Sequence, residues 1–76
     1  MNRIKGIVYA VKNKYGFIRC YPVGKPREDY FFHGSDTEGV EWFKLEQGDI
    51  VSFIPVDCER GPQAVQVRLE CERHLV

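Results

Sequence analysis

Two short aromatic stretches decide the fold of this chain: KYGFI at residues 14–18 and YFFH at residues 30–33. Aromatic and β-branched residues favour β-strands, in which alternate residues point to the same face. If the two strands are neighbours, one face of the pair carries four rings side by side, those of Tyr15, Phe17, Phe31 and His33. The sequence therefore predicts a ring platform, the name used below for these four side chains.

Whether this platform lies in a core or faces solvent depends on what the other face of the strands supplies. Aromatic residues on strands commonly belong to a core. Here Ile18 and Phe32 already provide an inward face, and Gly16 weakens a strand unless something packs closely against it. A solvent-facing platform flanked by Lys14 and Arg19 suits a single-stranded nucleic acid, whose bases stack on aromatic rings.

Three further strand-like runs accompany the two aromatic ones. In chain order the five expected strands cover residues 4–11, 15–20, about 29–33, 49–55 and 63–69. Three residues separate the first two strands, which predicts an antiparallel hairpin. Pro55 is expected at the end of the fourth strand, and the fifth strand is expected to alternate with Val65, Val67 and Leu69 inward.

The connections contain turn-forming residues and no long amphipathic period. Residues 21–28 include two prolines and a glycine, which exclude a regular element, and residues 34–48 can hold a short helical turn at most. Five strands without a substantial helix are typical of a small barrel. We therefore expect an all-β fold, a five-stranded antiparallel OB-fold barrel. It forms a single domain over residues 1–76, with a core at about residues 4–69 and a C-terminal tail at residues 70–76.

Charge is unevenly distributed along the chain, although the formal net charge is zero. Residues 1–27 hold seven basic residues and no acid, residues 28–59 carry a formal charge of −8, and the remainder carries +1. The basic first third can form a local positive face suited to phosphates. Because screening at physiological salt acts over about 8 Å, folding could equally average out this asymmetry.

Cysteine usage indicates reduced thiols rather than disulfides or a metal site. The three cysteines, Cys20, Cys58 and Cys71, form no Cys-x-x-Cys pair. Cys71 and His74 have a ligand-like spacing, but structural zinc sites usually need four ligands in two close pairs. We therefore expect no metal and no cofactor.

Neither a membrane segment nor a catalytic site is expected. No apolar run approaches the roughly 20 residues that span a bilayer, and the start of the chain lacks a signal-peptide pattern. We therefore expect a cytoplasmic protein without a membrane partner. His33 could act as a general base only with an orienting partner and a pocket. No Ser, Cys or second His stands in a catalytic motif near it, so we expect no enzyme activity.

At these residues the sequence resembles the cold-shock domain family. NKYGFI at residues 13–18 is similar to the family's first ribonucleoprotein motif, Lys-Gly-Phe/Tyr-Gly-Phe-Ile, and YFFH at residues 30–33 is similar to the second. The likeness continues through LEQGDIVSF at residues 45–53 and RGPQA at residues 60–64, so it spans about residues 4–69. Four motifs in this order imply an OB-fold barrel that binds single-stranded nucleic acid on the face of strands two and three.

The resemblance implies binding residues beyond the ring platform. Trp42 stands where the family has a loop aromatic that stacks a base, and Asp29 matches an acid that accepts hydrogen bonds from base edges. Arg60 and Gln63 match the polar end of the loop before the last strand. The bases would stack on the platform, and the phosphates would be held by Lys12, Lys14 and Arg19, with Lys5 as a further candidate.

Three departures from the family pattern predict a shorter or weaker site. Ala10 takes the place of the family's strand-one Trp, and Gly34 stands where a further Phe is usual. Each missing stacking group removes about 1–3 kcal/mol per base, and the candidates to compensate are Tyr9, Trp42 and Phe43. The turn before the first aromatic strand is two residues shorter than in bacterial cold-shock proteins. In this it resembles the animal upstream-of-N-ras type of RNA-binding protein.

Two functions remain open from the sequence. The favoured one is a single-stranded nucleic-acid-binding module that binds RNA, or alternatively single-stranded DNA, and acts as an RNA chaperone or translational regulator. The alternative is an OB-fold protein-interaction module that has lost nucleic-acid binding, with the acidic residues 28–59 contacting a basic protein partner. We expect a monomer, with a swapped dimer as the alternative.

Overall fold

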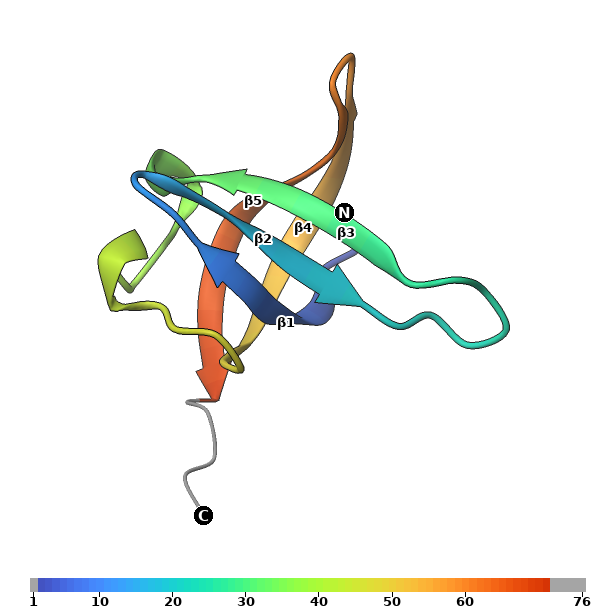
Figure 1. Ribbon diagram of the computed structural model, residues 1–76, viewed down its shortest axis with the longest axis horizontal. Helices are drawn as coiled ribbons and strands as arrows, with labels where there is room; N and C mark the ends of the chain where they lie inside the picture. The colour runs from blue at the N-terminus through green and yellow to red at the C-terminus, as the bar shows by residue number, and fades with distance from the viewer. Residues whose placement is uncertain (1, 72–76) are drawn as a thin grey trace.

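The computed structural model describes residues 2–71, and its strands close into a barrel (Figure 1). In chain order the strands are β1 (Ile4–Val11), β2 (Tyr15–Cys20), β3 (Glu28–His33), β4 (Ile50–Cys58) and β5 (Gly61–Cys71). The connection from β3 to β4 contains two 3-10 turns, η1 (Gly34–Asp36) and η2 (Trp42–Lys44). The five-stranded all-β barrel predicted from the sequence is confirmed. Of the expected tail, residues 72–76 lie outside the described part of the chain.

The strands follow one another around the barrel in the order β1-β2-β3-β5-β4. Four neighbouring pairs are antiparallel, as expected, but β3 and β5 are parallel and meet at Phe31 and Gln63. The expectation of an entirely antiparallel barrel therefore differs from the structure at this pair. A closed ring of five strands cannot reverse direction at every step, because five is odd, so one neighbouring pair must run the same way.

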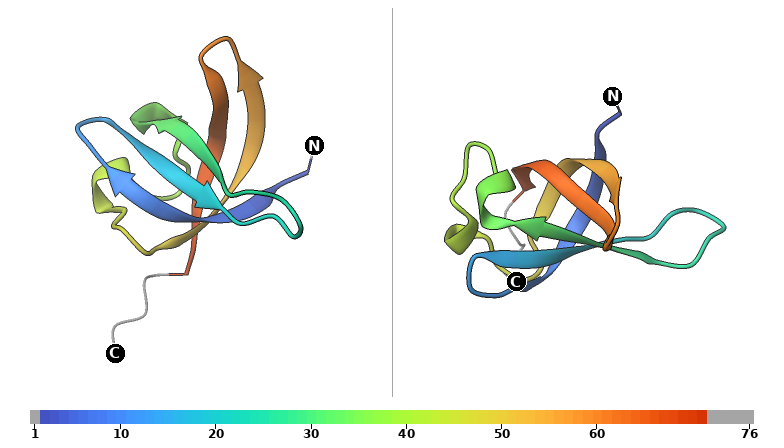
Figure 2. Two further views of the ribbon diagram at one scale, coloured as in Figure 1. Left: turned by 45° about the vertical axis from the view of Figure 1, so that its right-hand side comes forward. Right: turned by 90° about the horizontal axis from the view of Figure 1, so that it is seen from above.

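The hairpin of β4 and β5 extends farther than the sequence predicts. The predicted fourth strand ends at Pro55, whereas β4 continues to Cys58, and β5 begins at Gly61 rather than Gln63. Beyond Phe53 the described pairing of β4 is with β5 alone. A proline in this part of β4 sits on a strand with a free edge, where its missing N–H is tolerated. The hairpin consequently projects from the barrel, as does the β2–β3 connection in another direction (Figure 2).

A β-bulge changes which residues of β5 face the core. Gln66 adopts a φ of +52°, and the pairing of β5 with β4 shifts register in this region. Ala64 and Val67 are fully buried, whereas Val65 and Leu69 are only partly covered. The predicted inward position is therefore confirmed for Val67 and for Leu69, which packs against the core. Ala64 replaces Val65 in the core, because the extra residue of the bulge reverses the faces on one side of it.

The inward face of β2 and β3 is filled as predicted. Ile18 and Phe32 are fully buried, and they join a core cluster with Val8, Cys20, Tyr30, Leu45, Val51, Phe53, Ala64 and Val67. The backbone of Gly16 lies so close to Phe32 that a Cβ at this position would come within 2.7 Å of the phenyl ring. A close approach of the backbone thus requires glycine here, and the side chains of the neighbouring Tyr15 and Phe17 point away from the core.

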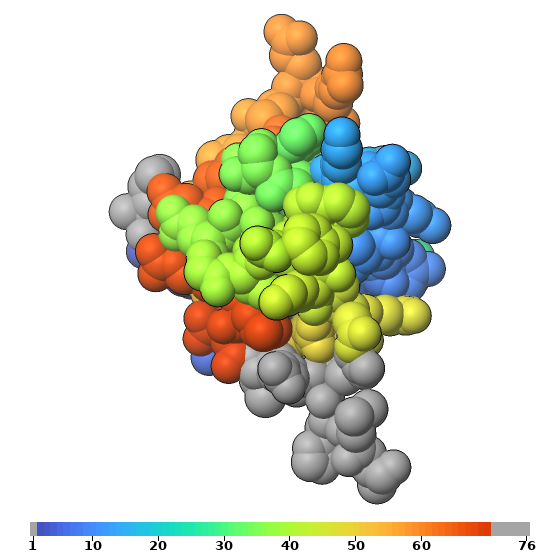
Figure 3. Space-filling view, turned by 90° about the vertical axis from the view of Figure 1, so that its left-hand side faces the viewer, coloured from blue at the N-terminus to red at the C-terminus, as the bar shows by residue number. Residues whose placement is uncertain are grey.

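The connection from β3 to β4 covers one end of the barrel. Leu45 inserts into the core, and the Asp49 carboxylate accepts a hydrogen bond from the Glu46 N–H at 2.9 Å. The short helical turn expected in this connection is present twice, as η1 and η2. Figure 3 shows the connection, coloured green to yellow, lying between the β1–β2 turn and β5.

Residues 2–71, the described part of the chain, contain neither a membrane-crossing helix nor a cluster of metal ligands. In that range no helix is long and apolar enough to cross a membrane. The same range contains no group of three or more His, Cys, Asp or Glu side chains that could hold a metal ion. The spacing of Cys71 and His74 falls outside the described side chains.

Candidate nucleic-acid interface

The outer face of β2 and β3 carries three aromatic rings in mutual contact. Phe17 pairs with Phe31 across the two strands, and Tyr15 pairs with His33. The Tyr15 and Phe31 rings stack with centroids 5.6 Å apart at an angle of 28°. Phe17 meets Tyr15 and Phe31 edge-on, with centroid distances of 6.0 and 5.9 Å. The ring platform predicted from the sequence is therefore assembled, on the face away from the core.

His33 lies at one end of the platform and is oriented by the turn that follows it. Its Nδ1 accepts a hydrogen bond from the Ser35 N–H at 3.2 Å, and the Ser35 Oγ lies 2.9 Å from the same nitrogen. A backbone N–H can only donate, so a neutral His33 ring carries its proton on Nε2. Ser35 was not among the sequence-based candidates, and it leaves the Nε2–H of His33 as the donor directed away from η1.

Arg19 and Asp29 pair with each other at the opposite end of the platform. They face each other across β2 and β3, with Nε–Oδ1 and Nη2–Oδ2 distances of 2.8 and 3.3 Å. This hydrogen-bonded contact raises the pKa of the Arg19 guanidinium and lowers the pKa of the Asp29 carboxyl. Tyr9 of β1 lies over the pair, with its ring centroid 3.7 Å from the Arg19 Cζ. The charges predicted to contact phosphates and base edges therefore offset each other.

A groove of about 490 Å³ lies between the ring platform and the β4–β5 hairpin. Phe17 and Phe31 line one side, and the hairpin lines the other with Cys58, Glu59, Arg60, Gly61, Pro62 and Gln63. The two polar residues predicted near the start of the last strand, Arg60 and Gln63, are therefore brought beside the rings.

The amide of Gln63 is held in place within this groove. Its Nε2 donates to the Asp36 Oδ2 at 3.3 Å, and its Oε1 accepts from the Cys58 Sγ at 3.1 Å. Neither Asp36 nor Cys58 was a predicted site residue. The fourth strand was expected to end at Pro55, which left Cys58 in a turn, and Asp36 lies 27 residues from Gln63.

Trp42 and Phe43 lie side by side on η2, with ring centroids 5.6 Å apart in an edge-to-face arrangement. Trp42 packs against the core, whereas Phe43 is 59% exposed. The Trp42 indole also lies against Gly34, so close that a Cβ at this glycine would be 2.7 Å from the Trp42 Cδ1. The absence of the family's Phe at position 34 thus has a local cause, since the indole occupies the space that such a side chain would need.

Lys12 and Lys14 are exposed on the turn between β1 and β2. The Lys12 N–H donates to the Tyr15 carbonyl at 2.7 Å, and Lys14 adopts a φ of +70°. Its carbonyl accepts from the Gly34 N–H at 2.7 Å, which ties the turn to the end of β3. Lys5 lines a second groove near the start of β1, together with Arg19.

The comparison with known families decides the class of this chain. Residues 4–70 match the 'Cold-shock' DNA-binding domain. The chain belongs to the cold-shock domain family. Membership supports single-stranded nucleic-acid binding, which agrees with a barrel that presents contacting rings on the outer face of β2 and β3.

Two relatives show how far the likeness of this cold-shock domain extends. Over 40 residues it is 50% identical to the cold shock-like protein CspD of Bacillus cereus, an alignment that covers 53% of this chain and 61% of that protein. A structure of Drosophila Unr cold-shock domains matches with a TM-score of 0.71 at 22% identity, covering 99% of this chain and 29% of that chain. At this identity the structural likeness shows the fold. The chain spans less than two thirds of the length of either relative.

The predicted site residues of the cold-shock domain are distributed around the ring platform. The Arg19–Asp29 pair and Tyr9 lie at one end, and His33 and the β1–β2 turn lie at the other. The hairpin residues flank the platform across the groove. Lys5 lines a second groove, which Arg19 also lines.

Proposed function

We propose that this cold-shock domain binds single-stranded RNA by stacking successive bases on Tyr15, Phe17 and Phe31. The observation that carries the proposal is the set of three contacting, partly exposed rings on the outer face of β2 and β3. The inward face of these strands is already filled by Ile18 and Phe32, so core packing does not account for the rings. Every base has a planar face, and stacking on an aromatic ring contributes about 1–3 kcal/mol per base.

Polar groups around the rings complete the proposed site. Lys12 and Lys14 would hold phosphates at the β1–β2 turn, and His33 would donate from its Nε2–H. Across the groove, Arg60 and the fixed amide of Gln63 would contact the strand from the hairpin.

The choice of RNA is supported by the short turn between β1 and β2, which resembles that of the upstream-of-N-ras type of RNA-binding protein. A strand whose bases are stacked on the domain cannot pair with a second strand. The domain would therefore act as an RNA chaperone or translational regulator. The proposal has it act as a monomer in the cytoplasm, through binding and without catalysis.

Fluorescence of Trp42, the only tryptophan of the sequence, provides the test. Titration with single-stranded RNA heptamers should quench its emission with micromolar or tighter affinity, and DNA heptamers of the same sequence should bind more weakly. Phe17→Ala/Phe31→Ala should abolish the binding, whereas Arg68→Ala, on the outer face of β5, should not change it. Tighter binding of DNA would move the ligand class to single-stranded DNA. A flat titration of folded protein, with no heat of binding by calorimetry, would reject the proposal in favour of a protein-interaction module.

The salt dependence of RNA binding tests how much of the affinity comes from stacking and how much from phosphate contacts. Because Asp29 offsets the charge of Arg19, the main candidates for phosphate contacts are Lys12, Lys14 and Arg60. Two to four contacts predict a slope of log K against log salt concentration of about −1.4 to −2.8 for a single strand. A much steeper slope would mean that charge, rather than stacking, dominates the affinity.

A further inference from the structure

Tyr9 lies over the guanidinium of Arg19, which Asp29 holds in place. Its ring centroid lies 3.7 Å from the Arg19 Cζ, and Asp29 holds the guanidinium from the side through hydrogen bonds of 2.8 and 3.3 Å. The Arg19 side chain is 16% exposed, whereas Tyr9 is 46% exposed. The covered guanidinium thus supports a ring that itself remains open to solvent.

Arg19 is poorly suited to holding a phosphate in this arrangement. Of the donors on its guanidinium, Asp29 takes up the Nε–H and one Nη–H and offsets the charge. One planar face of the guanidinium is turned to Tyr9, in the geometry of a cation–π contact. By contrast, Lys12 and Lys14 are exposed on the β1–β2 turn.

The register of β1 brings Tyr9 next to the ring platform. Val8 is buried and Tyr9 is exposed, and a bulge between Val8 and Ala10 shifts the pairing with β2. Ala10 pairs with Phe17, and Arg19 follows Phe17 by two residues on the same face of β2. Tyr9 over Arg19 therefore continues the platform beyond Phe17, on the side where Ala10 supplies no ring.

We propose that Tyr9 is an additional base-stacking site of this domain, and that Arg19 and Asp29 are positioning residues that hold its ring. The inference rests on the proposed nucleic-acid binding and adds one nucleotide to the bound strand, next to the base on Phe17. It reassigns Arg19 from a phosphate contact to a planar support. A ring that is already held in place loses less side-chain entropy when a base stacks on it than a mobile one does.

A length series of single-stranded RNA measures the additional nucleotide. The affinity of the unmodified protein should rise with each nucleotide until the Tyr9 site is filled. In Tyr9→Ala the last rise should vanish, a loss of about 5- to 150-fold for the longest strand. Tyr9→Phe keeps the ring and should stay within about twofold of the unmodified protein. A length series that is unchanged in Tyr9→Ala would overturn the inference.

Arg19→Lys separates the planar group from the charge. Lysine keeps the charge but lacks the fork that pairs with Asp29 through two bonds and the plane that stacks on Tyr9. We expect Arg19→Lys to lower the affinity several-fold with an unchanged salt slope, and to have no further effect in the Tyr9→Ala background. If Arg19 holds a phosphate instead, Arg19→Lys will keep most of the affinity, and Arg19→Ala will flatten the salt slope by about 0.7. That result would overturn the positioning role.

A fluorescent reporter distinguishes failure of this inference from failure of the proposed function. In Tyr9→Trp/Trp42→Phe the emission comes from position 9 alone, and a base stacked there should quench it. RNA binding detected by calorimetry without a change in this emission would reject the Tyr9 site and leave the proposed function standing. Absence of RNA binding by the unmodified protein would reject both.

Discussion

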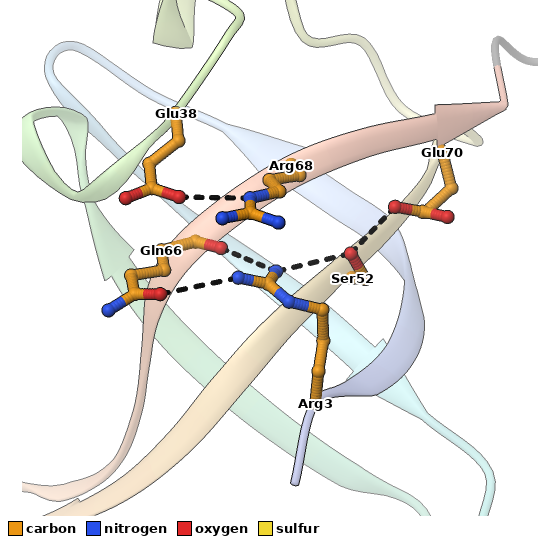
Figure 4. A network of polar contacts seen from close by, with 6 residues as sticks. All are labelled: Arg3, Glu38, Ser52, Gln66, Arg68 and Glu70. Carbon is orange, nitrogen blue, oxygen red and sulfur yellow. Dashed lines mark hydrogen bonds and ion pairs between the residues drawn. The ribbon is translucent and has the colours of Figure 1, made fainter. Parts of the chain in front are cut away.

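On the outer face of β2 and β3 the platform rings are partly exposed, whereas on the β4–β5 face polar side chains hydrogen-bond to one another around the buried Ser52 (Figure 4). On the latter face Arg3 donates to the Ser52 Oγ at 3.2 Å and to the Gln66 carbonyl at 2.7 Å. Ser52 in turn donates to Glu70 at 2.8 Å. The contacts of Arg3 also stabilise the β-bulge of β5, because one of their partners is Gln66, the bulge residue with positive φ.

The two faces differ in what they leave for a ligand. A hydrogen-bonded network uses the donors and acceptors that a ligand would need, whereas a ring keeps its π face open even when its edge packs against a neighbour. The contrast therefore predicts that substitutions on the ring face change affinity, and that substitutions on the network face change the free energy of unfolding.

The largest expected effect is a loss of affinity when two platform rings are removed. Phe17→Ala/Phe31→Ala should weaken oligonucleotide binding by about 2–6 kcal/mol, because each lost ring removes about 1–3 kcal/mol of stacking. The free energy of unfolding should fall much less, since both rings lie on the outer face. Isothermal titration calorimetry and denaturant unfolding on the same variant measure the two effects separately.

Phe32→Ala is the matched control, because Phe32 neighbours Phe31 on the same strand and is fully buried. It should lower the free energy of unfolding by about 3–5 kcal/mol. If Phe31→Ala destabilises the fold as strongly as Phe32→Ala does, the platform is part of the core and the contrast between the faces is lost.

The next effect depends on pH and concerns the buried side of β2. Burial raises the pKa of the Cys20 thiol from an ordinary 9.0 to about 11. The folded state then holds this proton more tightly than the unfolded chain does. The resulting stability is fully present below the unfolded pKa and is lost as the pH rises toward 11, by up to roughly 2–3 kcal/mol. Denaturant unfolding between about pH 8 and about pH 11 should show a smaller loss in Cys20→Ala, and an equal loss would refute the assignment.

A smaller effect is expected on the network face. Ser52→Ala should lower the free energy of unfolding by about 1–2 kcal/mol, because Arg3 and Glu70 lose the hydroxyl that links them. Arg68→Ala, which removes the more exposed pair with Glu38, should cost less than about 1 kcal/mol. Thermal unfolding measures both variants. A change of oligonucleotide affinity in either one would break the separation between the faces.

The smallest expected effect is at Lys14, where one substitution should change both the free energy of unfolding and RNA binding. Lys14 has a φ of +70°, and the family motif has glycine at this position. Lys14→Gly should therefore raise the free energy of unfolding by about 1 kcal/mol. It should also flatten the salt slope of RNA binding by about 0.7, through the loss of one phosphate contact. Lys14→Ala removes the charge but keeps the unfavourable backbone conformation, so it should show the binding effect without the gain in stability.

Local patterns were sufficient to predict the strands that carry the site. The bounds of β1 and β2 agree with the sequence prediction, and the predicted β3 starts one residue late. The alternation that buries Ile18 and Phe32 and turns the platform rings outward is a property of each strand by itself. The family motifs added the expectation of binding on the face of the second and third strands and of a loop aromatic.

Contacts between distant segments could not be predicted in the same way. Single residues such as Arg19 and Asp29 were assigned roles, but their pairing depends on the register between two strands. The contact of Trp42 with Gly34 depends on how the long connection folds back. The bulge at Gln66 shifts the alternation of β5 without a local signal, because glutamine favours neither a bulge nor a positive φ.

The parallel junction between β3 and β5 has the fewest paired residues of the junctions that close the barrel. Its described register consists of Phe31 with Gln63, whereas β2 and β3 pair along their whole length. The candidate groove lies across this junction, since Phe31 lines one side and Gln63 the other. A strand bound in the groove would join the two edges, so RNA should slow the local opening that amide hydrogen exchange detects at β3 and β5. Binding of the RNA would then also stabilise the closed form of the barrel.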